Sequence, residues 1–159
     1  MNTFLNGMEK ILKAVVSAII GLMLFWVFVQ VITRYVFNYT PSFGEELARY
    51  MFVWVVFLSL PIVAKKGGHM AIEMITARLR GTALRTVNLI GDAFTLIFLV
   101  IMVWHGAGMV MRASFQTSPA LQISMSWVYL AIPIGCGIML LNVLLHFLTL
   151  LRPVADGRD

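Results

Sequence analysis

Few residues in this sequence could do chemistry, and most of them lie near the ends of long apolar runs. A charged side chain is costly near the centre of a bilayer, so each charged residue within such a run is a candidate functional residue. One group lies around two neighbouring run ends and consists of Arg34, Glu45, Glu46 and Arg49. We expect this group to be an ion-pair cluster, in which Arg34 pairs with Glu45 or Glu46, or a contact for a partner protein.

Asp92 is a second candidate, because it lies about two helical turns into a later apolar run. Its depth predicts a position near one membrane surface. It could pair with Arg85, Lys65 or Lys66, or it could face a partner subunit. A proton or ion pathway would need further acidic or polar groups across the membrane, and the sequence does not supply them.

The three histidines raise the possibility of metal or haem binding. Antiparallel helices would place His105 and His146 in opposite leaflets, which is too far apart for two axial ligands of one haem iron. His69 lies four residues before Glu73, and we expect a contact at the membrane surface, either between these two residues or with a partner. The sequence shows no zinc-ligand spacing, no phosphate-binding glycine loop and no nucleophile beside a base. It therefore predicts no metal, no cofactor and no enzymatic activity.

The elements that carry these residues follow from the composition. The chain has 159 residues, of which 60% are hydrophobic and 12% are charged, whereas soluble domains are roughly 45–50% apolar and about 25% charged. Uncharged runs of about 20 residues are typical of membrane-spanning helices. We predict one all-α integral membrane domain over residues 1–159, with four transmembrane helices over residues 11–37, 45–64, 84–111 and 127–151.

Two local features modify this plan. Residues 69–80 have an apolar face and a polar face and are too short to span, which favours an amphipathic helix at the membrane surface. An ordinary polar linker is the other interpretation. Pro133 lies within the last run and predicts a bend in that helix.

The basic residues predict the orientation. With the N-terminus inside, nine of them fall on the cytoplasmic side and three on the outside, in agreement with the positive-inside rule. The cytoplasmic set is Lys10, Lys13, Lys65, Lys66, Arg78, Arg80, Arg85, Arg152 and Arg158, and the outer set is Arg34, Arg49 and Arg112. We therefore expect both termini in the cytoplasm, and we interpret the net charge of +5 as a topology signal and not as a nucleic-acid patch.

Several stretches together resemble a known family. They are Ser-Phe-Gly-Glu-Glu-Leu-Ala-Arg-Tyr at 42–50, Phe-Val-Trp at 52–54, Lys-Lys-Gly-Gly-His at 65–69, Ile-Glu at 72–73, Thr-Ser-Pro-Ala-Leu at 117–121, Trp-Val-Tyr at 127–129 and Ala-Ile-Pro-Ile-Gly at 131–135. In order and spacing the sequence resembles the small, DctQ-like membrane subunit of tripartite ATP-independent periplasmic (TRAP) transporters. The resemblance covers nearly the whole chain.

The resemblance implies a non-catalytic subunit of the bacterial inner membrane. Its partners would be the lipid bilayer, a large TRAP membrane subunit that carries the substrate and sodium sites, and a periplasmic substrate-binding protein. The small subunit would enlarge the static scaffold against which the large subunit moves. The substrate would be an organic acid such as a dicarboxylate or sialic acid.

Three other functions remain possible from the residues. A small self-sufficient homodimeric transporter would need a membrane-embedded carboxylate in a central cavity, and Asp92 is the available residue. A haem-binding electron-transfer anchor is disfavoured by the histidine depths. An assembly factor unrelated to transport is the third.

Overall fold

The computed structural model describes residues 2–39, 42–65 and 82–151. Its helices are α1 (Asn2–Val36), α2 (Ser42–Lys65), α4 (Thr82–Ala113), α5 (Ser126–Tyr129) and α6 (Ala131–Leu151). Four segments are long and apolar enough to cross a membrane, namely Gly7–Val36, Ser42–Ala64, Thr86–Ala113 and Ser126–Thr149. The predicted all-helical fold with four candidate spans is confirmed. The amphipathic helix expected over 69–80 lies outside the described residues.

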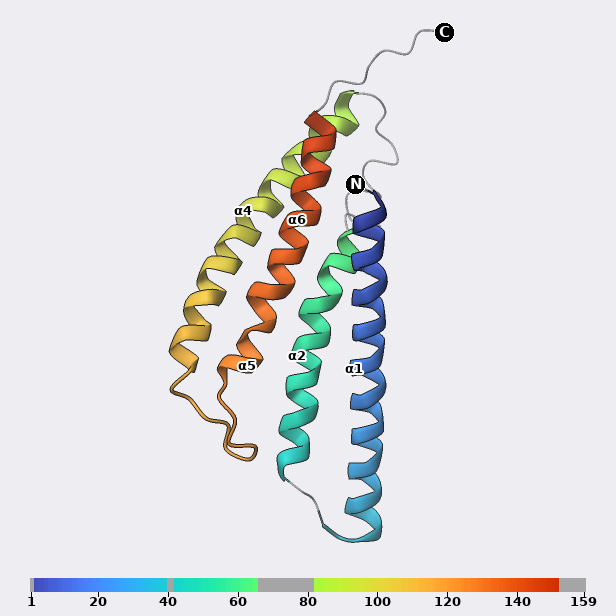
Figure 1. Cartoon of the computed structure of the whole chain (residues 1–159), viewed down its shortest axis with the longest axis vertical. Coiled ribbons are helices and arrows are strands. Elements are labelled where there is room, and N and C mark those ends of the chain that lie inside the picture. Colours follow the sequence, from blue (N-terminus) through green and yellow to red (C-terminus); the bar gives the residue numbers. More distant parts are fainter. Residues whose placement is uncertain (1, 40–41, 66–81, 152–159) are drawn as a thin grey trace.

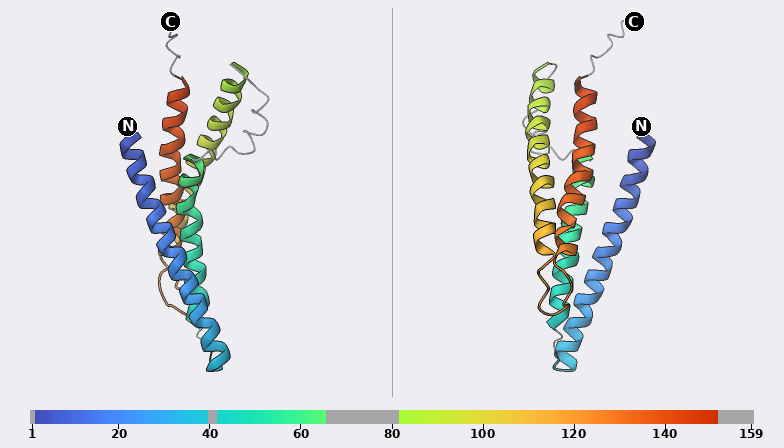
Figure 2. Two further views of the ribbon diagram at one scale, coloured as in Figure 1. Left: turned by 90° about the vertical axis from the view of Figure 1, so that its right-hand side faces the viewer. Right: turned by 60° about the vertical axis from the view of Figure 1, so that its left-hand side comes forward.

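The four long helices stand in a row, in the order α1, α2, α6 and α4 (Figure 1). Among the described residues, α1 contacts α2 but neither α4 nor α6. We call the end with the start of α1 and the end of α6 the terminal end. The opposite end, with the α1–α2 and α4–α5 connections, is the loop end. The row is twisted, because the helices converge toward the terminal end in the view of Figure 1 but toward the loop end in the views of Figure 2.

The core consists of two narrow seams between neighbouring helices. Leu12 and Val16 of α1 pack with Leu58 of α2 in the first seam. The second seam centres on Leu99 of α4 and on Cys136 and Val143 of α6. In each seam a helix buries only one narrow face, so most of its surface remains outside the core.

A proline and a glycine set the close approach of α2 and α6. Pro61 has no N–H and cannot donate to the carbonyl of Phe57, its partner four residues earlier in a regular helix. Gly135 of α6 lies against this carbonyl group. A Cβ atom built on Gly135 would meet the Phe57 oxygen and would lie 2.7 Å from its carbon. Only a residue without a side chain fits between these two backbones.

The last span is interrupted near the proline for which the sequence predicts a bend. The helical segment is interrupted at Leu130, between α5 and α6. Pro133 is the third residue of α6, and its ring would clash with the carbonyl of Tyr129 in a continuous helix. The break therefore lies where the proline disrupts regular geometry.

Most of the apolar surface of the four helices is exposed in the single chain. Between 6% and 28% of the residues in each apolar window are buried. The exposed set includes Phe25 and Phe28 of α1, Phe52 of α2, Phe94 and Phe98 of α4 and Leu141 of α6. Such a surface is stable only against lipid or against other membrane-embedded protein.

Candidate functional site

The loop end contains a polar site in which Glu46 of α2 binds the connection between α4 and α5. The hydroxyl of Ser118 donates to the Glu46 carboxylate. The backbone N–H of Ala120 lies 3.2 Å from either carboxylate oxygen, and the N–H of Leu121 lies 3.1 Å from Oε2. One carboxylate thus accepts hydrogen bonds from Ser118, Ala120 and Leu121. Pro119, which lies between the first two, has no N–H to donate.

The loop is folded so that these donors point to one place. Residues 114–125 form a narrow hairpin closed by a bridge between Thr117 and Ser124. The N–H of Ser118 donates to the carbonyl of Ile123 at 2.9 Å, and the N–H of Gln122 donates to the carbonyl of Ser118 at 3.0 Å. Gln122 takes a positive φ of 52°, which turns the chain back at the tip. The Ser118 side chain is buried.

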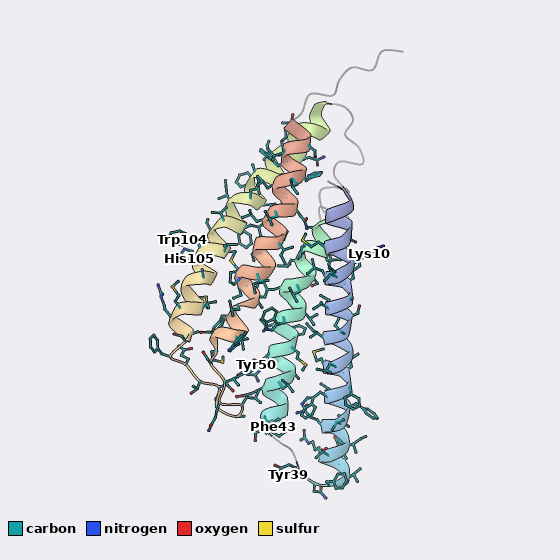
Figure 3. All side chains as sticks on the ribbon, in the orientation of Figure 1. Lys10, Tyr39, Phe43, Tyr50, Trp104 and His105 are labelled. Atoms are coloured by element: carbon teal, nitrogen blue, oxygen red, sulfur yellow. The ribbon has the colours of Figure 1, made fainter. Side chains whose placement is uncertain are left out.

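Other contacts from α2 and α4 hold the same loop. The Tyr50 hydroxyl donates to the sulfur of Met125 at 3.4 Å, and Tyr50 lies on the loop side of α2 (Figure 3). The Ser126 hydroxyl donates to the carbonyl of Val110 at 2.7 Å. The guanidinium of Arg49, one turn after Glu46, attracts the Glu46 carboxylate electrostatically. Contacts from both α2 and α4 therefore hold this loop.

The sequence predicted an ion-pair cluster of Glu46 with Arg34, Glu45 and Arg49, but in the part of the chain that the structure describes none of these three residues forms an ion pair with Glu46. Arg34, Glu45 and Arg49 are all exposed. Within the described residues, no ion pair links Arg34 to Glu45 or Glu46, and none links Glu45 to Arg49. The structure thus directs Glu46 toward the loop instead of toward α1.

The contact between α1 and α2 at the loop end is made by aromatic and small residues. The rings of Trp26 and Phe43 lie with their centroids 5.7 Å apart. A Cβ atom on Gly44 would meet the side chains of Gln30 and Trp26. Gly44 therefore lets α1 and α2 approach closely at the place where the sequence predicted an ion pair.

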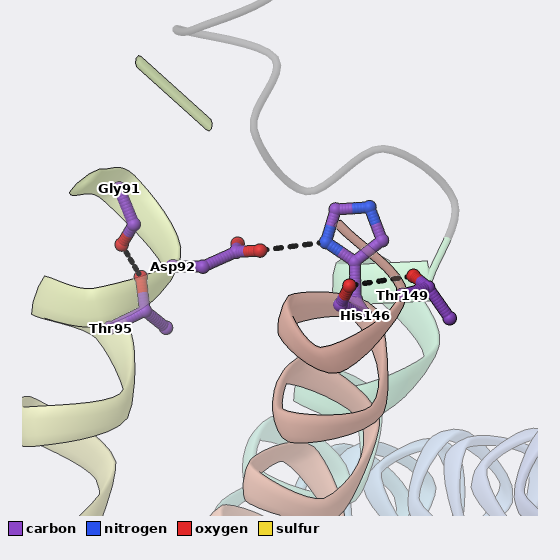
Figure 4. Close-up of polar contacts among 5 residues, drawn as sticks. All are labelled: Gly91, Asp92, Thr95, His146 and Thr149. Atoms are coloured by element: carbon purple, nitrogen blue, oxygen red, sulfur yellow. Dashed lines mark hydrogen bonds and ion pairs between the residues drawn. The ribbon is translucent and has the colours of Figure 1, made fainter. Parts of the chain in front are cut away.

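The terminal end contains a second polar site, between Asp92 of α4 and His146 of α6. Oδ2 of Asp92 lies 2.7 Å from Nδ1 of His146 (Figure 4). The Asp92 side chain is 1% exposed, whereas the His146 side chain is 54% exposed. The pair joins α4 and α6 across the second seam. Because Nδ1 is held against Asp92, the opposite edge of the imidazole faces outward.

His146 is a partner of Asp92 that the sequence did not predict. The residues expected for Asp92 were Arg85, Lys65 and Lys66, whose side chains lie outside the described part of the chain. Depth along the helices could have indicated this pair, because Asp92 lies ten residues after the start of α4 and His146 lies five residues before the end of α6. Antiparallel helices bring such positions to one level.

The remaining predicted site residues, His69 and Glu73, lie outside the described residues. Within the described ranges, no group of three histidine, cysteine or acidic side chains is arranged to hold a metal ion. The chemistry of the two polar sites is therefore hydrogen bonding and ion pairing between helices and a loop.

Comparison with known proteins identifies relatives over most of the chain. A family model described as "Tripartite ATP-independent periplasmic transporters, DctQ component" matches residues 23–153. The sialic acid TRAP transporter small permease protein SiaQ of Vibrio cholerae is 24% identical over 152 residues, which are 96% of this chain and 86% of that protein.

Two further relatives are similar over a shorter stretch. A putative TRAP transporter small permease protein of Haemophilus influenzae is 29% identical over 97 residues, or 61% of this chain and 60% of that protein. The isethionate TRAP transporter permease protein DctMQ of Oleidesulfovibrio alaskensis is 29% identical over 102 residues, or 63% of this chain. This match spans 16% of the length of the isethionate protein.

Proposed function

The chain belongs to the DctQ component family of the tripartite ATP-independent periplasmic (TRAP) transporters, and we propose that it acts as a small permease subunit paired with a large membrane permease. The subunit is a non-catalytic scaffold. The large permease carries the transport path, and a periplasmic binding protein delivers the substrate.

The open row of helices is the observation that carries this proposal. A self-contained transporter needs a polar site near the bilayer midplane, commonly lined by broken helices. Here α1 and α4 lie at opposite edges of the row without contact between them. Among the described residues of the spans, the buried charged residue is Asp92, which contacts His146 near the terminal end. A row with two wide apolar faces suits a subunit that covers another membrane protein.

The relatives support the same assignment. The matching stretch forms a small part of the longer isethionate permease, as expected if small and large permease parts work together. Two relatives are named for isethionate and for sialic acid, both organic acids. We infer that an organic acid is the transported class for this chain as well, with ion-coupled uptake across the bacterial inner membrane.

The orientation proposed from the basic residues places the terminal end at the cytoplasm and the loop end at the periplasm. In this orientation, the loop bound by Glu46 faces the side from which a periplasmic protein would approach. Glu45 and Arg49 are exposed beside it and are free to contact a partner. We also propose that His69 and Glu73 make a contact at the inner membrane surface, with each other or with a partner.

The test is affinity purification of the tagged chain from its native membrane in mild detergent, with mass spectrometry of the proteins that accompany it. We expect a large multi-helix permease in near-stoichiometric amount. Recovery of a homo-oligomer alone would contradict the proposal and would favour a self-sufficient homodimeric transporter.

A further inference from the structure

His105 is a polar side chain on the membrane-facing side of α4. It is exposed, and no described residue forms a hydrogen bond or ion pair with it. The other exposed residues of α4 between Ile90 and Ala107 are apolar or aromatic. His105 and Trp104 project from the side of α4 that faces away from α6 (Figure 3).

The position of His105 along its span places it within the hydrocarbon. The span runs over Thr86–Ala113, and at about 1.5 Å per residue His105 lies about 8 Å from its midpoint. The hydrocarbon core is about 30 Å thick, so its half-thickness is about 15 Å. Neither water nor lipid headgroups reach that depth in an undisturbed bilayer, and acyl chains offer no hydrogen-bond partner.

An imidazole in this place is costly against lipid, but it is useful against a second helix. Ionisable residues in membrane helices almost always face protein or a water-filled cavity. Side chains such as histidine form hydrogen bonds between packed helices, and small residues let the backbones come close. Gly108 provides such a notch one turn from His105, because a Cβ atom there would meet no atom within 4 Å.

We propose that the face of α4 around Trp104, His105 and Gly108 is the docking surface for a transmembrane helix of the large permease. That helix presents a hydrogen-bonding group opposite the imidazole and an apolar flank opposite Trp104, which is 79% exposed. The inference rests on the proposed function, because it names where the large permease binds. Because α6 covers the opposite side of α4, the helix of the large permease extends the row at its α4 edge.

The first experiment places the photo-crosslinker p-benzoylphenylalanine at position 104, in place of Trp104, in cells that contain the native transporter proteins. The matched control has the same crosslinker in place of Phe28, an aromatic residue of α1 that is 64% exposed. After irradiation, covalent products are purified through a tag on this chain and identified by mass spectrometry. We expect a covalent product with the large permease from position 104.

The outcomes separate this inference from the proposed function. If the unmodified chain purifies without a large permease, the proposed function fails and the docking surface fails with it. If the permease accompanies the chain but is captured from position 28 and not from 104, only the docking surface is wrong. Capture of a second copy of this chain from position 104 also overturns it, as does a product with lipid alone.

A second experiment tests the hydrogen bond itself. His105→Leu replaces the imidazole with an apolar side chain of similar size, which lipid accommodates. We expect about three- to tenfold less large permease per tagged chain, the range typical of one interhelical hydrogen bond. His105→Gln keeps donor and acceptor groups and should retain most of the binding. Equal recovery with His105→Leu and with the unmodified chain would contradict the role of the imidazole.

Discussion

Ser118 donates its hydroxyl hydrogen to the carboxylate of Glu46, although 72 positions separate the two residues. Glu46 lies in the first helical hairpin, and Ser118 lies in the loop of the second. Together with the N–H groups of Ala120 and Leu121, this contact holds the two hairpins together at the loop end. It also joins two of the sequence stretches on which the family resemblance was based.

Replacement of Glu46 by alanine should release the α4–α5 loop. The three loop donors would lose their acceptor, and donors left unsatisfied in a partly buried site are unfavourable. We expect faster cleavage within residues 114–125 in limited proteolysis of the purified protein. Glu46→Gln, which keeps an acceptor oxygen, should show an intermediate rate.

The neighbouring Glu45 provides the matched control. It is exposed, and none of the described loop donors bonds to it. Glu45→Ala should therefore be cleaved at the rate of the unmodified protein. Equal cleavage of the Glu46 and Glu45 variants would show that the carboxylate does not hold the loop.

Gly135→Ala should loosen the packing of α2 against α6. The added methyl group would meet the Phe57 backbone, and overpacking of this kind costs about 1–3 kcal/mol. Gly137→Ala is the control, because a Cβ atom there meets nothing within 4 Å, and its stability should be unchanged or slightly higher.

The single cysteine gives a convenient readout for these glycine variants. Cys136 is 2% exposed, so a thiol-reactive fluorophore should label it only as the protein unfolds. Gly135→Ala should lower the midpoint temperature of labelling, and Gly137→Ala should not. A lower midpoint in both variants would indicate a general loss of stability unrelated to the Phe57 contact.

The Asp92–His146 pair should show energetic coupling. In a double-mutant cycle with Asp92→Asn and His146→Ala, we expect a coupling free energy of about 0.5–2 kcal/mol, the range for directly bonded side chains. The measurement is equilibrium unfolding of the four proteins in detergent micelles. Strict additivity of the two single changes would mean that the 2.7 Å contact contributes nothing measurable.

Cysteine labelling should test the proposed orientation. In a Cys136→Ala background, a cysteine replacing Phe115, which is 92% exposed at the loop end, should react with a membrane-impermeant maleimide in spheroplasts. A cysteine replacing Lys10, exposed near the terminal end, should react only after the membrane is permeabilised. The reverse pattern would place the loop end in the cytoplasm.

The sequence predicted four apolar spans and singled out Glu46 and Asp92, but it did not predict the contacts of Glu46 with the loop or of Asp92 with His146. It predicted a bend near Pro133, because a proline disrupts a helix locally, and the helix is interrupted three residues earlier, at Leu130. It offered Arg34 for Glu46 and lysine or arginine for Asp92, because opposite charges at similar depth are the obvious pairs. The structure instead gives Glu46 a set of uncharged loop donors. It adds a histidine from α6 as a partner of Asp92, and the predicted pairing with Arg85, Lys65 or Lys66 stays a prediction because those side chains lie outside the described part of the chain.

The sequence by itself determined that this chain is a membrane protein with four helical spans, since the preference for lipid is a sum over about 20 consecutive residues and needs no knowledge of neighbours. The tertiary structure decided the order of the helices in the row, the loop that Glu46 binds and the helix that Asp92 meets. Spans that are apolar on nearly all sides carry little information about which face meets which neighbour. That choice is made by close packing at a few positions, such as Gly135 against Phe57, which no single stretch of sequence contains.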